Sequence, residues 1–419
     1  MKKICLTVVG LYILLLMHAF AQVSTKDTSA YKFKPLALEE VNLVTSYYTQ
    51  DGNHSPITGG IGSEKVTDLA NMLELKLVGH SEGYTKHTIT AGLGVDHHTA
   101  ASAAYVSKTG ASSQGGTRVY PSLNWTAENE KKGTEFGIGT YYSTEYNYKS
   151  YAFDAHVAKK ITNNSEVSLK VSAYLDQVKL IYPSELIPNT TTTSGGTVYI
   201  TTPSGRTTTL SSGGGSGEYK IPSTPRNTFT GSLSFSQVIN RRLQAALFLD
   251  AITQNGYLGL PFHRVYFTDG TEKVENLPSA RTKIPVGVRL NYFAGDKVIF
   301  RTYYRYYTDD WGLSAHTASI EIPYKFSSFF SISPFFRYYS QTASRYFAPY
   351  TAHKTTDQYY TSNYTQSAFN SSFFGAGVRI APPKGLFNSH LSSLEIRYGH
   401  YTQTTDLLSD VLSFEFKFK

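Results

Sequence analysis

Hydrophobic and polar residues alternate with a period of two along most of the chain. In residues 165–177, Val167, Leu169 and Val171 alternate with Ser168 and Lys170. A period of two over about ten residues is that of a β-strand with one apolar and one polar face. The alternation predicts sixteen strands, at 40–50, 68–78, 86–97, 117–127, 133–146, 150–160, 165–180, 227–238, 242–254, 284–293, 298–309, 313–325, 329–342, 367–381, 391–402 and 409–418. Segment 68–78 also fits a helix, and we assign it as a strand from its neighbours.

The connections between these segments fall into two classes of length. Tight turns at 128–133, 162–165, 239–242, 294–297 and 325–328 alternate with connections that are mostly long, at 51–67, 98–116, 181–226, 255–283 and 343–366. Short turns at one end and long loops at the other are typical of an outer-membrane barrel. A soluble β-sandwich has the same alternation but no physical reason to sort its loops by length. We therefore predict an all-β fold, a single antiparallel transmembrane β-barrel of about 16 strands (range 14–18), with both termini on the periplasmic side.

The first 21 residues have the features of a secretory signal peptide. Lys2 and Lys3 precede an apolar stretch, and Ala19-Phe20-Ala21 is a small-x-small cleavage site. The alternative is an uncleaved anchor helix. We predict a signal peptide at 1–21, a periplasmic segment at 22–39 and the barrel at 40–419, and hence secretion to the cell outer membrane of a Gram-negative bacterium. The single Cys, Cys5, would leave with the signal.

Aromatic residues and the last strand add two expectations about the surroundings of the barrel. Aromatic girdles are expected at the headgroup level of lipid and lipopolysaccharide. At the loop end they comprise Tyr47, Tyr48, Tyr142, Tyr146, Tyr151, Tyr304, Tyr306 and Trp311, and at the turn end Tyr292, Phe293, Tyr324 and Phe326. The last strand, VLSFEFKFK, resembles the C-terminal signal read by the barrel-assembly machinery, which usually ends on the aromatic residue, whereas this chain ends on Lys419.

Charge argues against one class of partner. The chain carries 39 basic and 31 acidic residues, a net charge of +8, which becomes +6 once Lys2 and Lys3 are removed. No basic cluster follows the spacing of a phosphate backbone, so we expect no nucleic-acid partner.

The parity of each strand predicts which charged residues face the lumen. From residue 284 onward the inward set is basic, comprising Arg289, Arg301, Arg305, Arg337, Arg379, Arg397 and Lys417, against Glu321, Glu395 and Glu415. The earlier strands supply Lys76, Lys170 and His156 against Glu74, Asp96, Glu135, Asp154, Asp176 and Asp250. Such a lumen is acidic on one side and basic on the other, and its transverse field would orient dipolar solutes. The alternative is that these charges form cross-strand ion pairs.

We find no catalytic constellation and expect no enzyme. Asp96-His97-His98 and Asp309-Asp310 resemble the Asp/His sets of rim proteases, but strands 3 and 11 of sixteen lie on opposite sides of the barrel, roughly 30 Å apart. His97 and His98 could bind a metal with Asp51 or His54. Adjacent residues of a strand point to opposite faces, so an exposed pair is favoured. We expect no cofactor and no metal.

The connection after the first predicted strand is the most distinctive segment. Residues 51–64 read DGNHSPITGGIGSE, in which glycines permit a positive φ and polar side chains supply many oxygens. The residues singled out are Asp51, Asn53, Ser55, Thr58, Gly59, Gly60, Gly62 and Glu64. Two interpretations stay open: a structured loop that caps the barrel, or a contact for a small ligand or cation.

This run, D-G-N-x-S-x-x-T-G-G-x-G-S-E, resembles outer-membrane barrels grouped as domain of unknown function 3570. The resemblance extends over residues 22–419, and this loop is its specific motif. The family has no assigned activity. Its genes often lie beside flavin transferases that attach FMN to exported proteins, which implies an envelope redox system as a setting. No residue argues for a bound flavin.

Lumen size completes the functional expectation. Sixteen strands give a circumference on the order of 100 Å and a diameter of roughly 30 Å, too wide for side chains alone to fill. We expect a channel or transport component for small polar or anionic solutes. The alternative is a non-conducting binding or scaffold barrel for an envelope partner, such as a flavin-linked redox protein.

Overall fold

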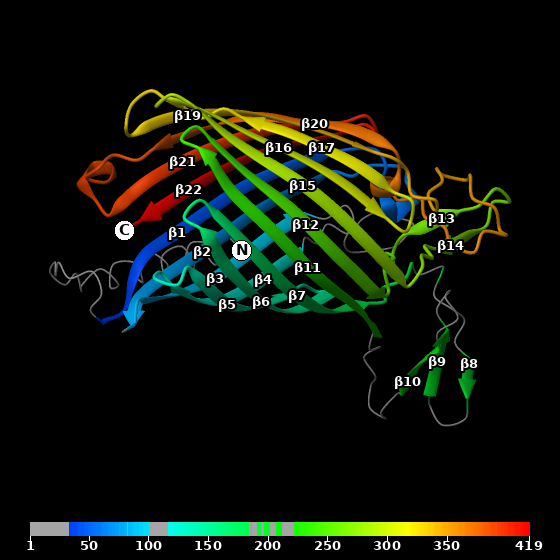
Figure 1. Cartoon of the computed structure of the whole chain (residues 1–419). Helices are drawn as coiled ribbons and strands as arrows, with labels where there is room; N and C mark the ends of the chain where they lie inside the picture. Colours follow the sequence, from blue (N-terminus) through cyan, green and yellow to red (C-terminus); the bar gives the residue numbers. More distant parts are fainter. Residues whose placement is uncertain are drawn as a thin grey trace.

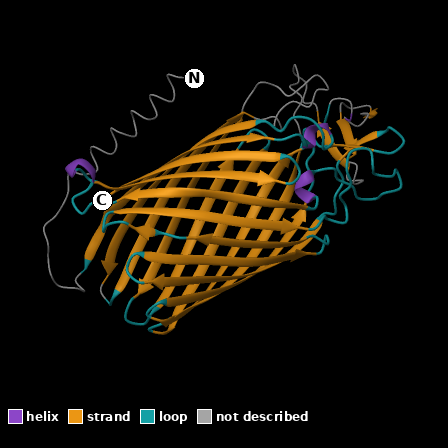
Figure 2. Cartoon of the chain, turned by 90° about the horizontal axis from the view of Figure 1, so that it is seen from above, coloured by secondary structure: helices purple, strands orange, loops and turns teal. Residues whose placement is uncertain are grey.

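The fold is a closed antiparallel β-barrel with irregular loops at one end (Figures 1 and 2). The computed structural model describes residues 33–81, 83–99, 116–183, 186, 191–193, 197–201, 207–211 and 222–419. The predicted signal peptide at 1–21 and most of the segment at 22–39 lie outside the described residues. Among those that are described, no helix is long and apolar enough to cross a membrane.

Each strand of the barrel pairs with its neighbours in the sequence, and β22 closes the ring on β1. The sheet contains 17 strands, of which β17 and β18 share one position, so the ring has sixteen positions. They are β1 (Lys34–Asp51), β2 (Val66–Ser81), β3 (Thr85–Thr99), β4 (Gly116–Asn129), β5 (Thr134–Thr144), β6 (Tyr148–Thr162), β7 (Ser165–Lys179), β11 (Ser223–Asn240), β12 (Leu243–Gly256), β15 (Ala280–Ala294), β16 (Val298–Asp309), β17 (Ser314–Glu321) with β18 (Tyr324–Lys325), β19 (Phe330–Gln341), β20 (Phe369–Ile380), β21 (Leu391–Gln403) and β22 (Leu407–Phe418).

All sixteen predicted segments are strands of this ring, including 68–78, where the pattern alone left a helix open. Most strand bounds differ from the predicted ones by a few residues, and two differences stand out. β1 begins at Lys34 rather than at residue 40. The predicted strand 313–325 is interrupted at Ile322-Pro323, where the proline supplies no backbone N–H to the ladder.

The two faces of each strand have different surroundings. In β12, Leu247 and Leu249 are 55% and 46% exposed on the outer face, whereas Phe248 between them lies inside the barrel under the guanidinium of Arg289. Apolar side chains on the outside suit a hydrocarbon solvent, and polar ones inside suit water. This arrangement defines a transmembrane barrel.

The external connections contain the small remaining elements. These are the short helices η1 (Pro56–Thr58) and η3 (Tyr364–Gln366), the hairpin β13 (Arg264–Tyr266) with β14 (Glu272–Val274), and a separate sheet of β8 (Thr191–Thr193), β9 (Thr197–Thr201) and β10 (Thr207–Ser211). One further short helix, η4 (Leu386–Asn388), lies in the β20–β21 connection at the opposite end. Figure 1 shows β13 and β14 beyond the end of the barrel that faces away from the C-terminus.

Buried apolar side chains gather in these external connections rather than inside the barrel. Three clusters form there: Leu180, Tyr182 and Val274; Ile57 and Phe262; and Val265, Phe267 and Tyr360. The loops therefore have a hydrophobic core of their own.

Candidate functional site

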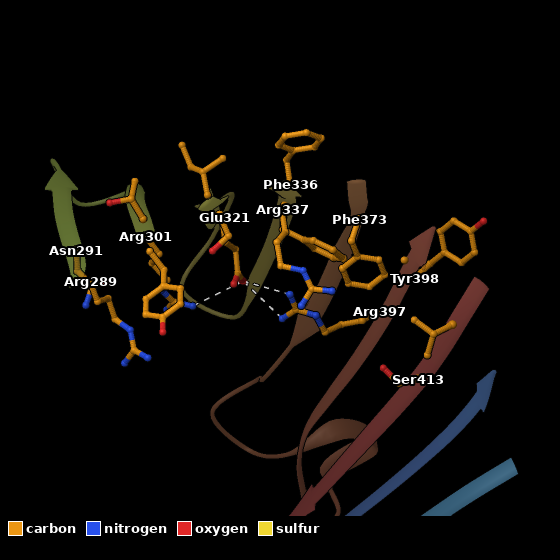
Figure 3. A pocket seen from close by; sticks show the side chains of 17 residues that line it. Arg289, Asn291, Arg301, Glu321, Phe336, Arg337, Phe373, Arg397, Tyr398 and Ser413 are labelled. Atoms are coloured by element: carbon orange, nitrogen blue, oxygen red, sulfur yellow. Dashed lines mark hydrogen bonds and ion pairs between the residues drawn. The ribbon is translucent and has the colours of Figure 1, made fainter. Parts of the chain in front are cut away.

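A recess of about 630 Å³ in the lumen wall contains four arginines (Figure 3). They are Arg289 from β15, Arg301 from β16, Arg337 from β19 and Arg397 from β21. The strand register brings them to one level of the barrel: Arg289 lies opposite Tyr303, Arg301 opposite Glu321, and Arg397 opposite Gly377. Alternation places all four on the inner face, as the parity of the sequence predicts.

Aromatic rings hold these guanidinium groups in place. Arg289 lies 5.0 Å above the ring of Phe248 and 5.9 Å from that of Tyr303. Arg337 lies 5.0 Å above Phe373, and Arg397 lies 5.2 Å above Phe335. Stacking on a ring orients a guanidinium and leaves its N–H edges available to a solute.

The arginines differ in their access to a counter-charge. Arg301 and Arg397 share Glu321, at 3.7 and 3.5 Å, and Arg397 also contacts Glu395 at 3.1 Å (Figure 3). Within the part of the chain that the structure describes, neither Arg289 nor Arg337 has a carboxylate within 4.0 Å. The recess is thus net positive. Arg301 and Arg397 form the cross-strand ion pairs that the sequence left open as an alternative, whereas Arg289 and Arg337 keep an excess positive charge.

The remaining predicted arginines lie on the same inner wall. Arg305 pairs in register with Gly287 and Thr317, and its Nε is buried with no hydrogen-bond partner among the described residues. Arg379 lies opposite Ser331 and Glu395 in the strand register, toward the periplasmic end. Lys417 contacts Glu40 at 3.1 Å and Glu415 at 3.8 Å.

Three of the six lumen carboxylates predicted on the early strands have a basic partner in the described structure. Asp154 contacts Lys170 at 2.9 Å and Glu135 contacts His156 at 3.1 Å. Asp96 lies 3.8 Å from Arg118, an inward arginine of β4 that the sequence reading missed. The alternation of Arg118 with the apolar Val119 could have indicated that Arg118 faces the lumen. The acidic side of the lumen is therefore closer to neutral than the parity count implied.

The aromatic girdles are present in part. Tyr47, Tyr151 and Tyr304 are exposed on the outer face. Two residues predicted for this belt lie elsewhere. Trp311 is 3% exposed and donates from Nε1 to the carbonyl of Ala280 at 3.0 Å. Tyr48 points inward and donates to Gln50 at 2.8 Å, because residues 46, 48 and 50 share the lumen face.

The motif loop at 52–65 makes contacts within the protein. Asp51 pairs with Lys65 at 3.4 Å, and Asn53 donates to Asp406 at 3.4 Å. The carbonyl of Ser55 accepts from the amide of Gly60 at 2.9 Å and from the hydroxyl of Thr58 at 3.4 Å. The amide of Glu64 donates to Gly52 at 2.9 Å, and burial raises the pKa of its carboxyl group. These contacts fit the capping interpretation.

Three glycines of the motif have positive φ and pack closely. Gly59, Gly60 and Gly62 have φ values of 82°, 88° and 85°. A Cβ on Gly59 would lie 2.6 Å from the ring of Tyr266, and one on Gly60 would lie 2.5 Å from the carbonyl oxygen of Ser362. The motif thus allows the loop to approach two others, at 257–279 and 342–368.

A buried polar cluster joins the latter two loops. Glu275 accepts from the amide of Leu260 at 2.5 Å and from the hydroxyl of Thr361. His263, fully buried, lies 3.4 Å from the Glu275 carboxylate. Burial raises the pKa of Glu275 to about 7 and, with His353 nearby, lowers the pKa of His263 to about 3.

The histidines singled out in the sequence have separate partners. His98 contacts Glu145 at 3.1 Å, His97 contacts Thr117 at 2.9 Å, and His54 stacks on Tyr364 with 3.6 Å between ring centroids. Within the described ranges, no group of three or more His, Cys, Asp or Glu residues is arranged to hold a metal ion.

The closed barrel, the arginine recess in its lumen and the loops packed over one end together define an outer-membrane β-barrel with a basic lumen. We refer to these packed loops, 52–65, 257–279 and 342–368, as the cap. The chain belongs to the family described as protein of unknown function (DUF3570), whose model matches residues 42–408.

Solved structures similar to this chain include proteins of Pseudomonas aeruginosa. OccD3 (OpdP) has 8% identity and a TM-score of 0.43, covering 94% of this chain and 95% of that one. The outer membrane protein OprD has 8% identity and a TM-score of 0.41, with 93% and 95% covered. OccK7 (OpdD) has 10% identity and a TM-score of 0.42, with 91% and 98% covered. No curated protein matches the chain.

Proposed function

We propose that this protein is an outer-membrane channel for small polar solutes, with a preference for anions. The observation that supports it is the recess formed by Arg289, Arg301, Arg337 and Arg397, in which Glu321 is the one carboxylate among the described lining residues. With the carboxylates of Glu321 and Glu395 set against four guanidinium groups, the recess keeps a net positive charge, which attracts anions and repels cations.

Arg289 and Arg337 contribute most to this preference. Both lack a carboxylate partner in the described structure and both are stacked on rings, so their positive charge is neither neutralised nor free to swing away. A carboxylate or phosphate group could accept two parallel N–H bonds from either guanidinium. Arg301 and Arg397 are largely compensated by Glu321 and Glu395.

Single-channel recording in a planar bilayer under a KCl gradient tests the proposal. We expect steady open levels and a reversal potential that shows chloride to be more permeant than potassium. The double substitution Arg289→Gln/Arg337→Gln should reduce the chloride-to-potassium permeability ratio severalfold, because it removes the two uncompensated charges.

A matched control removes a positive charge outside the lumen. Lys132, exposed on the short β4–β5 turn, serves because Lys132→Gln changes net charge without touching the recess. Its permeability ratio should equal that of the wild type. If the folded barrel never opens to a conducting level, or if the double variant keeps the wild-type ratio, the proposal is wrong.

A further inference from the structure

The external loops that touch one another come from opposite sides of the barrel. Loop 52–65 connects β1 to β2, and loop 257–279 connects β12 to β15. From β2 to β12 the ring advances seven strands, through β3, β4, β5, β6, β7 and β11, and from β15 to β1 it again advances seven. The two loops therefore leave the rim at diametrically opposite points.

Direct contacts join these two loops. The guanidinium of Arg264 donates from Nη1 to the carbonyl oxygen of Ile57 at 2.8 Å, and this bond is buried. The side chains of Ile57 and Phe262 form a buried cluster, 5% and 9% exposed, against which Ile181 and Leu260 pack. A buried charge-assisted bond and an apolar cluster are the contacts of a stable interface rather than of two loops that brush past each other.

The chain length available shows where the contact lies. From Asp51 to Ile57 the chain spans at most about 21 Å, and from Gly256 to Arg264 at most about 28 Å. Half of the rim measures roughly 50 Å, whereas the diameter is roughly 30 Å. A path around the rim would need both segments fully extended, but each contains a turn, at Pro56–Thr58 and at Leu260–His263. The loops therefore reach each other across the lumen. The contact therefore bridges the external mouth.

A third loop supports the bridge. Tyr364, in loop 342–368 between β19 and β20, stacks on His54, and Ser362 lies against Gly60. The same loop is bonded to loop 257–279 through Asn276 and Tyr360, whose amides and carbonyls exchange hydrogen bonds of 3.2 and 2.8 Å. Three loops thus meet around the motif.

We propose that these loops form a gate across the external mouth, in which the contact of Ile57 with Phe262 and Arg264 is the latch. The gate is closed in this structure, and separation of loop 52–65 from loop 257–279 admits solute to the arginine recess. The inference rests on the proposed channel function and describes how opening of that channel is regulated. It assigns the family motif a role: Gly59 and Gly60 permit the close approach that the latch needs.

Locking the latch is the first test. In a Cys5→Ser background, which removes the single natural cysteine, the pair Ile57→Cys/Phe262→Cys is cross-linked with a mild oxidant in the refolded full chain. We expect the oxidised protein to conduct at least tenfold less than the same protein after reduction. Each single variant, treated with the oxidant, should conduct like the reduced pair.

Weakening the latch is the second test. Arg264→Gln removes the bond to Ile57, and a lost buried charge-assisted hydrogen bond corresponds to about a tenfold rise in the open fraction. Gly59→Ala should also raise the open fraction, because its Cβ would meet Tyr266. Gly62→Ala is the matched control: its φ is equally positive, but the one atom near its added Cβ is Thr58 Oγ1 of the same loop.

The outcomes separate the gate from the channel. If the cross-link forms and current is unchanged on reduction, the gate is wrong and the channel stands. Failure of the cysteine pair to cross-link in a folded barrel would also overturn the latch. If no variant conducts, whether locked, reduced or weakened, both the channel and the gate are wrong.

Discussion

Asp309 illustrates how a single charged residue is stabilised at the external end of the barrel. Its carboxylate is fully buried and accepts from Arg281 Nε at 3.0 Å, from the Tyr307 hydroxyl at 2.7 Å, and from the amides of Trp311 and Leu313 at 3.0 Å each. The sequence suggested this position only as half of a rim acid pair. In the structure, its carboxylate accepts the hydrogen bonds that hold the β16–β17 turn together.

We predict that Asp309→Ala destabilises the barrel by about 3–5 kcal/mol, because Arg281 would remain largely buried without its counter-charge. Asp309→Asn should cost less, since its amide oxygen still accepts from the turn amides. Guanidinium unfolding in lipid vesicles, followed by fluorescence of the two tryptophans, measures both. Equal losses for the two variants would mean that the turn bonds contribute nothing.

Glu275 predicts a pH dependence of the cap. Its pKa is raised by burial from 4.5 to about 7, so the folded cap binds this proton more tightly than an opened cap does. A raised carboxyl pKa contributes stability that is present below pH 4.5 and lost as pH rises to 7. The difference of about 2.5 units corresponds to roughly 3 kcal/mol.

His263 acts in the opposite direction. Its lowered pKa contributes stability that is present above pH 6.5 and lost as pH falls toward 3. The side chains of Arg226, His353 and Tyr257 also surround this cluster. A single pH profile would therefore mix two terms, and a comparison with Glu275→Gln is needed to separate them.

We expect the free energy of cap opening of the wild type, measured relative to that of Glu275→Gln, to fall by about 3 kcal/mol between pH 4.5 and 7. Protection of the Glu275 amide, which donates to the carbonyl of His263 at 2.9 Å, reports this opening in hydrogen exchange. A difference that does not vary with pH would show that Glu275 keeps an ordinary pKa.

At the scale of elements, the strands were predictable because their signal is local. A period of two fixes which face each residue takes, and one residue of slip would turn every side chain to the other side. This is why Arg289, Arg301 and Arg337 could be assigned to the lumen from sequence. The break at Pro323 was not predicted, and proline alone does not indicate one, because Pro121, Pro285 and Pro334 lie within unbroken strands.

The loops were not predictable, because their structure depends on contacts between distant segments. Nothing near Trp311 indicates that Ala280 and Tyr346 will bury it, and nothing near Gly59 indicates Tyr266. The Asp-Gly and Gly-Gly pairs permitted a positive φ, which the structure has at Gly59 and Gly60 but not at Gly52. The sequence did not indicate the partners that make it necessary. The motif and its backbone conformation could therefore be predicted from the sequence, whereas the contact between loops across the mouth could not.

At the scale of the whole molecule, the lumen has one wall with uncompensated arginines and one wall on which three of the six predicted carboxylates have a basic partner. Arg289 and Arg337 lie on β15 and β19, whereas the pairs of Asp154 with Lys170 and Glu135 with His156 lie on β5, β6 and β7. The field that an ion feels on the axis therefore comes chiefly from the basic wall, at a distance of about half the barrel diameter, roughly 15 Å.

This geometry predicts that anion preference depends on salt. The Debye length is about 30 Å at 0.01 M and about 3 Å at 1 M, so the basic wall acts on the whole lumen in dilute salt and only on ions in contact with it in concentrated salt. We expect the chloride-to-potassium permeability ratio of the wild type to fall toward the ratio of free mobilities at 1 M. The Arg289→Gln/Arg337→Gln variant should change little over the same range. A preference that persists at 1 M would instead indicate that anions pass in direct contact with the guanidinium groups of the recess.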